Sequence, residues 1–206
     1  MALSRVEFNR SRFSSMSRVG LLTGTFDPVH LGHIAMARAA IGACELDEVW
    51  FLVNPAPAHK TGVTALVDRM AMVRLAVAGE PAMREGAPDG AADPAAHTMA
   101  EFGRLMAHYP DTEFVFIVGI DVLATLDTWN YSEIVRSLSF AVARRAGGPE
   151  IKSDGHLRVQ WLDLAEHTEA SSRQVKAQLR AGERPAELDD GVFEYIQERG
   201  LYRVAA

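Results

Sequence analysis

Residues 20–33 read GLLTGTFDPVHLGH, and this stretch decides how the rest of the chain is interpreted. An apolar run ends at Gly24, an Asp-Pro pair follows, and two histidines lie three residues apart. The run predicts a buried strand over residues 18–24, and the pattern HLGHIAMARAAIGA predicts a helix over residues 30–43. Open α/β sheets bind ligands where the carboxyl end of a strand meets the start of a helix. A ligand site is therefore expected at this turn.

The alternation of apolar runs with helical periodicity continues along the chain, and it is typical of a parallel sheet with crossover helices. The fold class that we expect is α/β, a Rossmann-like doubly wound parallel sheet with C-terminal helices. A short helix is expected from Asp121. Further strands are predicted over residues 48–54, 113–119, 139–145 and 157–164, and further helices over residues 65–79, 98–106, 171–182 and 189–202.

Length and composition favour one folded, soluble domain. The chain has 206 residues, of which 48% are hydrophobic and 23% charged, close to ordinary globular usage. We expect residues 18–206 to form a single domain and residues 1–17 to be a disordered extension. Met16 as the functional start is a second explanation of that segment, and a transit peptide is a less favoured third.

Charge and cysteine content narrow the choice of partners and compartment. The formal net charge of -6 gives no general attraction to nucleic acid or to an anionic membrane, so neither is expected as a partner. No run approaches the roughly 18 apolar residues of a membrane span. The single cysteine, Cys44, allows no internal disulfide and fits a reducing compartment. We expect a cytoplasmic protein, and a homo-oligomer is left open.

The turn after the first strand has the residues of a phosphate site. Gly24, Thr25 and Phe26 lie where backbone N–H groups and the start of a helix favour an anion. His30 and His33 lie three apart, so helical geometry places them on one face. A structural zinc site needs about four ligands, and no further cysteine or carboxylate lies at a suitable spacing. Two imidazoles that donate to phosphate oxygens are the better interpretation, with no metal held by the protein.

GTFDPVHLGH resembles the signature of the nucleotidyltransferases of the HxGH type, which join a nucleoside triphosphate to a phosphorylated partner and release pyrophosphate. From about Arg18 to Arg203 the chain resembles the bacterial nicotinate-mononucleotide adenylyltransferases. The segments that carry this resemblance are NPAPAHK, FIVGIDVLATLDTW, VARRAG and FEYIQERGLYR. The resemblance implies that His30 and His33 bind the triphosphate and stabilise charge as its α-phosphate is attacked.

The same resemblance implies a mononucleotide site. Asp121, at a strand's carboxyl end, can accept hydrogen bonds from ribose or a pyridine amide, and a helix N-cap is its plainer role. Trp129 offers a flat face to a pyridinium ring, although an ordinary buried tryptophan is the alternative. His59 and Lys60 could pair with a 5′-phosphate, unless Lys60 is simply a solvated loop residue. The mononucleotide-binding residues predicted in this way are His59, Lys60, Thr98, Asp121, Trp129 and Arg145.

EASSRQVKAQL resembles the second signature of the superfamily, Ser-Ser-Thr-x-x-Arg, at the start of a helix. Ser171 and Ser172 match, but Arg173 stands where the family has Thr, and Lys176 stands where it has Arg. Lysine supplies a positive charge but lacks the planar, forked guanidinium of arginine, so the contacts with the triphosphate can differ from those of the family. Thr23 and His97 are further departures from the family pattern. The ATP-binding residues predicted in this way are Gly24, Thr25, Phe26, His30, His33, Ser171, Ser172, Arg173 and Lys176.

The expected reaction is direct in-line attack of the acceptor's 5′-phosphate on the α-phosphate of ATP. Positioning and charge stabilisation supply most of the rate in such transfers. Mg²⁺ is expected with the triphosphate, held mainly by phosphate oxygens and water. The acceptor is expected to be nicotinate mononucleotide, with nicotinamide mononucleotide open. Adenylyl or cytidylyl transfer to another phosphorylated acceptor, such as phosphopantetheine, and a nucleotide-binding module without catalysis are the alternatives.

Overall fold

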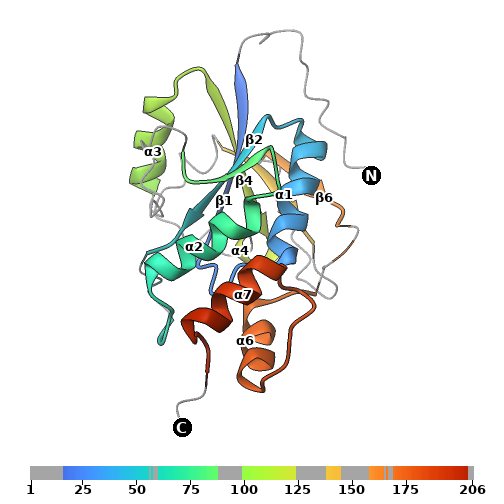
Figure 1. Ribbon diagram of the computed structural model, residues 1–206. Helices are drawn as coiled ribbons and strands as arrows, with labels where there is room; N and C mark the ends of the chain where they lie inside the picture. Colours follow the sequence, from blue (N-terminus) through green and yellow to red (C-terminus); the bar gives the residue numbers. More distant parts are fainter. Residues whose placement is uncertain are drawn as a thin grey trace.

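The computed structural model describes residues 16–55, 57, 60–87, 99–123, 138–144, 158–164, 166 and 169–203. Six parallel strands form one twisted sheet in the order β3-β2-β1-β4-β5-β6 (Figure 1). This is the strand order of a doubly wound fold, and it confirms the predicted class. The strands are β1 Ser17–Gly24, β2 Glu48–Val53, β3 Met83–Glu85, β4 Thr112–Gly119, β5 Ser139–Ala143 and β6 Arg158–Leu162.

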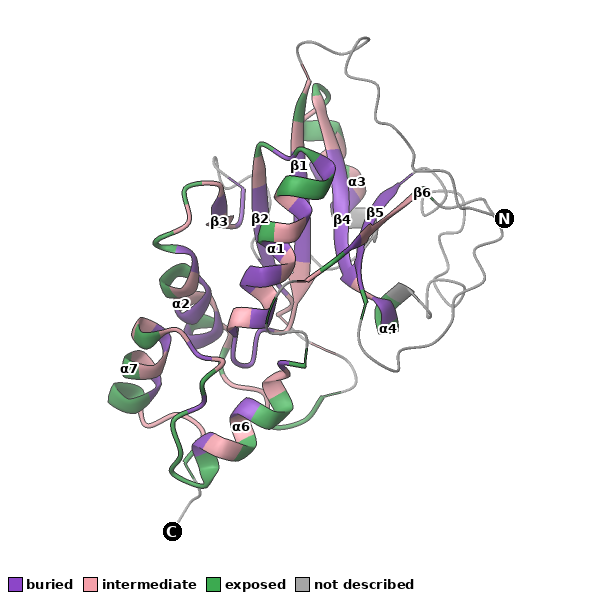
Figure 2. Cartoon of the chain, turned by 90° about the vertical axis from the view of Figure 1, so that its right-hand side faces the viewer, coloured by how far each residue is buried: buried purple, intermediate pink, exposed green. Residues whose placement is uncertain are grey.

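Apolar side chains on the two faces of the sheet form two cores, because crossover connections cover both faces with helices. One core joins the sheet to α1, α2, α6 and α7, and the other joins it to α3 (Figures 1 and 2). The middle of β1 and most of β4 are purple in Figure 2, since both faces of these central strands are buried there. The helices are α1 Leu31–Cys44, α2 Leu66–Val77, α3 Met99–His108, α4 Ile120–Leu123, α6 Ser172–Arg180 and α7 Asp190–Arg199.

Strand order locates the place where a ligand can enter. The connection from β1 crosses to β2 on one side, and β4 pairs with β1 on the other side, so the order reverses between β1 and β4. Helices leave opposite faces at such a switch point, and a crevice opens beside the carboxyl ends of the strands. The GTFDP turn follows β1 at this position, and α4 follows β4.

The predicted elements are present, with shifted ends. Strand β1 begins at Ser17, which the sequence placed in the N-terminal extension, and the hydroxyl of Ser17 lies 2.8 Å from that of Thr112 on β4. The helix expected from residue 30 begins at Leu31, with His30 as its N-cap. The strand expected to end at Arg145 ends at Ala143, and β3, three residues long, was not predicted.

Helix α7 is fastened to α2 by a buried carboxylate. Asp68 accepts hydrogen bonds from the hydroxyl of Tyr195 at 2.8 Å and from Nε of Arg199 at 3.2 Å. Asp68 is 6% exposed, so its charge depends on these partners. The C-terminal segment therefore supports the helix that stands beside the GTFDP turn.

Candidate active site

Phe26 belongs to the turn between β1 and α1, and its side chain packs underneath that turn. This residue has a φ of 48° and is 2% exposed, with its ring 4.9 Å from that of His33 and 5.6 Å from that of Phe51. A Cβ atom at Gly24 would lie 3.0 Å from the Phe26 ring. A side chain at residue 24 would therefore displace the Phe26 ring slightly, a reason for Gly24 that the sequence did not suggest.

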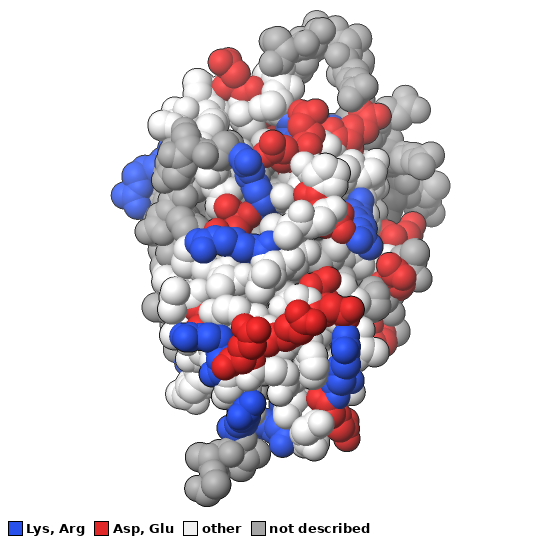
Figure 3. All heavy atoms as spheres, viewed as in Figure 1, with Lys and Arg blue, Asp and Glu red and all other residues white. Residues whose placement is uncertain are grey.

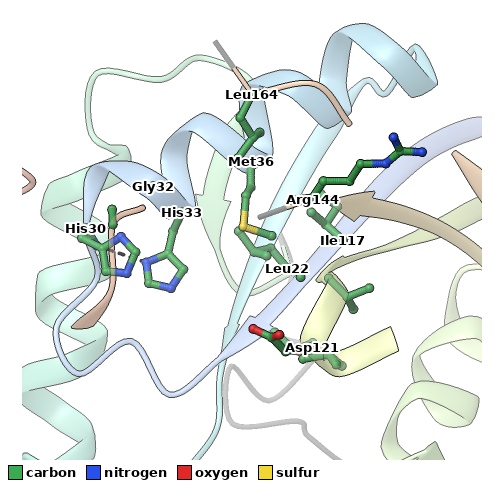
Figure 4. A pocket seen from close by; sticks show the side chains of 15 residues that line it. Leu22, His30, Gly32, His33, Met36, Ile117, Asp121, Arg144 and Leu164 are labelled. Atoms are coloured by element: carbon green, nitrogen blue, oxygen red, sulfur yellow. Dashed lines mark hydrogen bonds between the residues drawn. The ribbon is translucent and has the colours of Figure 1, made fainter. Parts of the chain in front are cut away.

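His30 and His33 lie together at the start of α1. Their ring centroids are 3.7 Å apart, and the backbone N–H of His30 donates to Nδ1 of His33 at 3.2 Å (dashed in Figure 4). A backbone N–H can only donate, so Nδ1 of His33 acts as the acceptor. The proton of a neutral His33 ring then sits on Nε2, where it can be donated to a ligand.

A cavity of about 190 Å³ lies beside the histidines. Typical ligand pockets measure about 300–1,000 Å³, so this one would take part of a substrate and not a whole dinucleotide. Figure 4 shows Met36 and Leu164 above the cavity and Asp121 across from the histidines. The lining residues are Leu22, Thr23, His30, Gly32, His33, Met36, Ile117, Val118, Gly119, Asp121, Val122, Ala143, Arg144, Leu164 and Ala170.

Arg144 lines this cavity, and the sequence analysis missed it. Its guanidinium carbon lies 4.4 Å from the centroid of the Trp161 ring, a cation–π contact between β5 and β6. The sequence pointed to its neighbour Arg145, which lies outside the described residues. The position could have been found from the end of the strand, since Arg144 directly follows Ala143 at the carboxyl end of β5.

The start of α6 contacts the GTFDP turn directly. Ser171 is the N-cap of α6 and accepts from the backbone N–H of Gln174, while the hydroxyl of Ser172 donates to the carbonyl of Pro28 at 2.9 Å. Nζ of Lys176 lies 2.8 Å from a carboxylate oxygen of Asp27. The two signatures thus form one structure, although 149 residues separate Asp27 from Lys176.

Asp27 is the buried centre of that structure. Its carboxylate is 3% exposed and accepts from Lys176 on one oxygen and from the hydroxyl of Tyr202, at 2.7 Å, on the other. Burial alone would raise the pKa of Asp27, but hydrogen bonds from Lys176, Thr64 and Tyr202 outweigh it and leave the pKa lowered. Burial also raises the pKa of Tyr202, so its hydroxyl remains a donor.

The lowered pKa of Asp27 predicts a pH dependence of stability. Its contribution is complete above the unfolded pKa of about 3.9 and is lost as the pH falls through the lower folded value. Because Asn does not titrate, the free energy of unfolding of wild type should fall more steeply than that of Asp27→Asn below about pH 4. Urea unfolding of both proteins from pH 6 to pH 3 measures this. A constant difference between them over that range would contradict the assignment.

Positive charge gathers beside the turn. Nζ of Lys60 donates to the hydroxyl of Thr25 at 2.9 Å. Partial desolvation lowers the pKa of Lys60, and the positive charges of Lys176, Arg69 and Arg173 lower it further, against the opposing charge of Asp27. A site where cations depress one another's pKa favours an anion such as a phosphate group.

The structure brings together residues predicted for both substrates. Thr25, predicted for ATP, and Lys60, predicted for the mononucleotide phosphate, are in hydrogen-bond contact. Asp121 lies within α4 and lines the cavity, so it is not the N-cap that was its alternative role. Gly24, Thr25 and Phe26 do not line the cavity itself. The predicted residues His59, Thr98, Trp129 and Arg145 lie outside the described residues, as does His97.

Among the described residues, no three His, Cys, Asp or Glu side chains are grouped closely enough to hold a metal ion. In the same part of the chain, no helix has the length and apolar character needed to span a membrane.

A parallel α/β sheet with histidines and cations at its switch point defines a nucleotide-binding class of protein. The family model described as cytidylyltransferase-like matches residues 21–178. The chain therefore belongs to the cytidylyltransferase-like family and, within it, to the group of the nicotinate-nucleotide adenylyltransferases.

Relatives match this chain over most of its length. A Geobacillus kaustophilus protein named probable nicotinate-nucleotide adenylyltransferase is 34% identical, over 91% of this chain and 87% of its own. A Gloeobacter violaceus protein of the same name is also 34% identical, over 92% and 98%. The solved Plasmodium falciparum nicotinic acid mononucleotide adenylyltransferase, complexed with NaAD, has a TM-score of 0.74 at 14% identity and covers 90% of this chain and 97% of its own. The last comparison supports the fold.

Proposed function

We propose that this chain transfers the adenylyl group of ATP to nicotinate mononucleotide, forming the dinucleotide and pyrophosphate in NAD biosynthesis. The observation that carries the proposal is the contact between Lys60 and Thr25 beside the histidine pair. A residue predicted to bind the acceptor's phosphate thus contacts a residue predicted to bind ATP, and the transfer requires the two substrates to meet. The names of the relatives support the same substrates.

The histidines are suited to the triphosphate. His33 has its Nδ1 occupied by the backbone N–H of His30, so Nε2 is the atom that can donate to a phosphate oxygen. Charge develops on the α-phosphate as it is attacked, and a donor fixed in advance stabilises that charge without reorganisation. We assign this role to His33, with His30 packed against it.

The reaction needs no covalent intermediate with the protein. An oxygen of the acceptor's 5′-phosphate forms a bond to the α-phosphorus of ATP, and the bond from that phosphorus to the bridging oxygen breaks. The electron pair of the broken bond leaves with pyrophosphate. A phosphate monoester is already anionic at neutral pH, so a general base is not required. Lys60 would hold the attacking phosphate beside Thr25, which orients it for an in-line displacement.

We propose that Mg²⁺ enters with the triphosphate. Mg²⁺ prefers to keep several waters and to bind substrate phosphates, so we expect phosphate oxygens and water to hold it. When bound, the ion would neutralise part of the triphosphate charge.

A panel of acceptors tests the proposal. Purified protein with Mg-ATP is given nicotinate mononucleotide, nicotinamide mononucleotide or phosphopantetheine, and pyrophosphate release is followed. We expect turnover with a pyridine mononucleotide and none with phosphopantetheine; CTP in place of ATP should not support it. Turnover with phosphopantetheine alone would overturn the proposal. ATP binding without release from any acceptor would point to a binding module.

The surface and the expected compartment fit this function. On the face in Figure 3, Lys and Arg alternate with acidic side chains, and a run of acidic ones crosses its lower half. That face does not offer the continuous basic surface that nucleic acid needs. We therefore propose small nucleotides as the substrates and the cytoplasm as the location. The oligomeric state stays open.

A further inference from the structure

Of the residues that the structure describes, Arg69 on α2 has the largest side chain that is almost completely buried, with 1% of it exposed. It lies beside the site, but it is outside both signatures, and the sequence suggested no role for it. A guanidinium has five N–H donors in a fixed fork, and a buried one is costly unless these donors are paired. The hydrogen-bond partners of Arg69 therefore indicate its role.

Among the described residues, the hydrogen-bond partners of Arg69 are backbone carbonyls around the site. Nε donates to Thr64 at 2.9 Å, one terminal nitrogen donates to Thr25 at 2.8 Å and to Asn54 at 2.7 Å, and the other donates to Pro55 at 3.2 Å. Asn54 and Pro55 come directly after β2, and Thr64 comes just before α2. One side chain thus binds both ends of the loop that carries Lys60, together with the turn that carries Thr25.

We propose that Arg69 is a positioning residue for phosphate binding, which sets the spacing of Lys60 and Thr25 by holding the loop and the turn to one another. The proposal rests on the proposed function, because it takes Lys60 as a contact of the acceptor's phosphate and Thr25 as a contact of ATP. Arg69 does not touch the substrate in this account. The guanidinium of Arg69 fixes the 2.9 Å contact between Lys60 and Thr25, the two side chains that do touch the substrates.

Arginine is suited to this role and lysine is not. Three segments converge on one side chain, and only a planar fork reaches carbonyls that lie in different directions. Burial lowers the pKa of Arg69, and the negative charge of Asp27 opposes that shift, so the guanidinium stays charged. Its charge also adds to the positive field at Lys60. A lysine would keep a charge but leave several carbonyls without a donor.

The conservative variant Arg69→Lys tests the positioning. We expect the KM for nicotinate mononucleotide to rise about tenfold, with a kcat within about threefold of wild type. The matched control is Arg74→Lys on the same helix, whose side chain is 61% exposed and paired with Glu85. The control should leave both constants unchanged. A folded Arg69→Lys protein with a KM within twofold of wild type would overturn the proposal.

A double-mutant cycle separates positioning from a general loss of stability. If Arg69 acts through Lys60, adding Arg69→Lys to Lys60→Ala should change the KM by less than twofold, because the group that it positions is already gone. Independent effects would multiply. A tenfold further increase in the Lys60→Ala background would contradict the account.

Hydrogen exchange tests Arg69 separately from the reaction. The amide of Asn54 donates to Gly24 at 2.7 Å and that of Lys60 to Pro57 at 3.1 Å. Both should exchange faster in Arg69→Lys than in wild type, even if no acceptor in the panel reacts; unchanged exchange would overturn the proposal. If Arg69→Lys does not fold, hydrogen exchange of the Nε–H of Arg69 is measured in the wild-type protein instead. Slow exchange would support the account, and rapid exchange would contradict it.

Discussion

Replacing His33 with Ala should lower kcat by about 10² to 10³, the usual effect of removing one fixed donor from a developing charge. Stability should change by only about 1 kcal/mol, because one hydrogen bond from the backbone of His30 is lost. Steady-state pyrophosphate release and urea unfolding measure the two effects. The loss would fall on kcat, since the donor acts mainly on charge that develops during the transfer.

Two further variants identify the nitrogen responsible. Glutamine at residue 33 places a donor near the position of Nε2 and should recover part of the rate, whereas asparagine keeps an acceptor near Nδ1 and should be as slow as alanine. His108→Ala, at the exposed end of α3, is the control and should turn over at the wild-type rate. Near-normal turnover of His33→Ala would refute the role given to His33.

The largest loss of stability is expected for Asp27→Ala. Removing one partner of a buried ion pair typically costs about 3–5 kcal/mol, because the other charge is left uncompensated. We expect the lower end of that range, about 3 kcal/mol, since the Lys176 side chain is 24% exposed and can partly rehydrate. Urea unfolding should show a lower midpoint with an unchanged slope.

Matched variants show whether the lost ion pair is the cause. Glu166→Ala removes a carboxylate that is 61% exposed and lies 3.8 Å from Arg38, and it should change stability by less than about 1 kcal/mol. Adding Lys176→Met to Asp27→Ala should restore part of the loss, because the stranded charge is then removed as well. An Asp27→Ala protein as stable as the Glu166→Ala control would show that the contact contributes little.

The class of fold could be predicted because long apolar strands alternate with periodic helices. Strand β3 could not be predicted, because its three residues, Met83–Glu85, are too few to show a period. On α2, Val73 and Val77 are buried, as an apolar spacing of three to four residues predicts, but Asp68 and Arg69 are buried as well, which the spacing does not predict. A charged residue is buried only when partners from elsewhere meet it, and those partners are distant in sequence.

The candidate site was predicted in part, for a similar reason. The turn, the histidines and Asp121 could be found because strand ends and helix starts are local features. The contacts of Lys176 with Asp27 and of Tyr202 with Asp27 could not, because they join segments that only the folded chain brings together. Lys176 was predicted to bind ATP, and the structure adds a partner for it that the sequence does not reveal. Its contact with ATP stays a prediction.

The fate of the α-phosphate tests the central claim most directly. ATP labelled at its α-phosphate is incubated with nicotinate mononucleotide, Mg²⁺ and the protein, and the labelled products are separated. We expect the label to appear in the nicotinate dinucleotide, with one pyrophosphate released for each dinucleotide formed. Label that stays in ATP, or that appears in AMP while the mononucleotide is unchanged, would contradict adenylyl transfer to this acceptor.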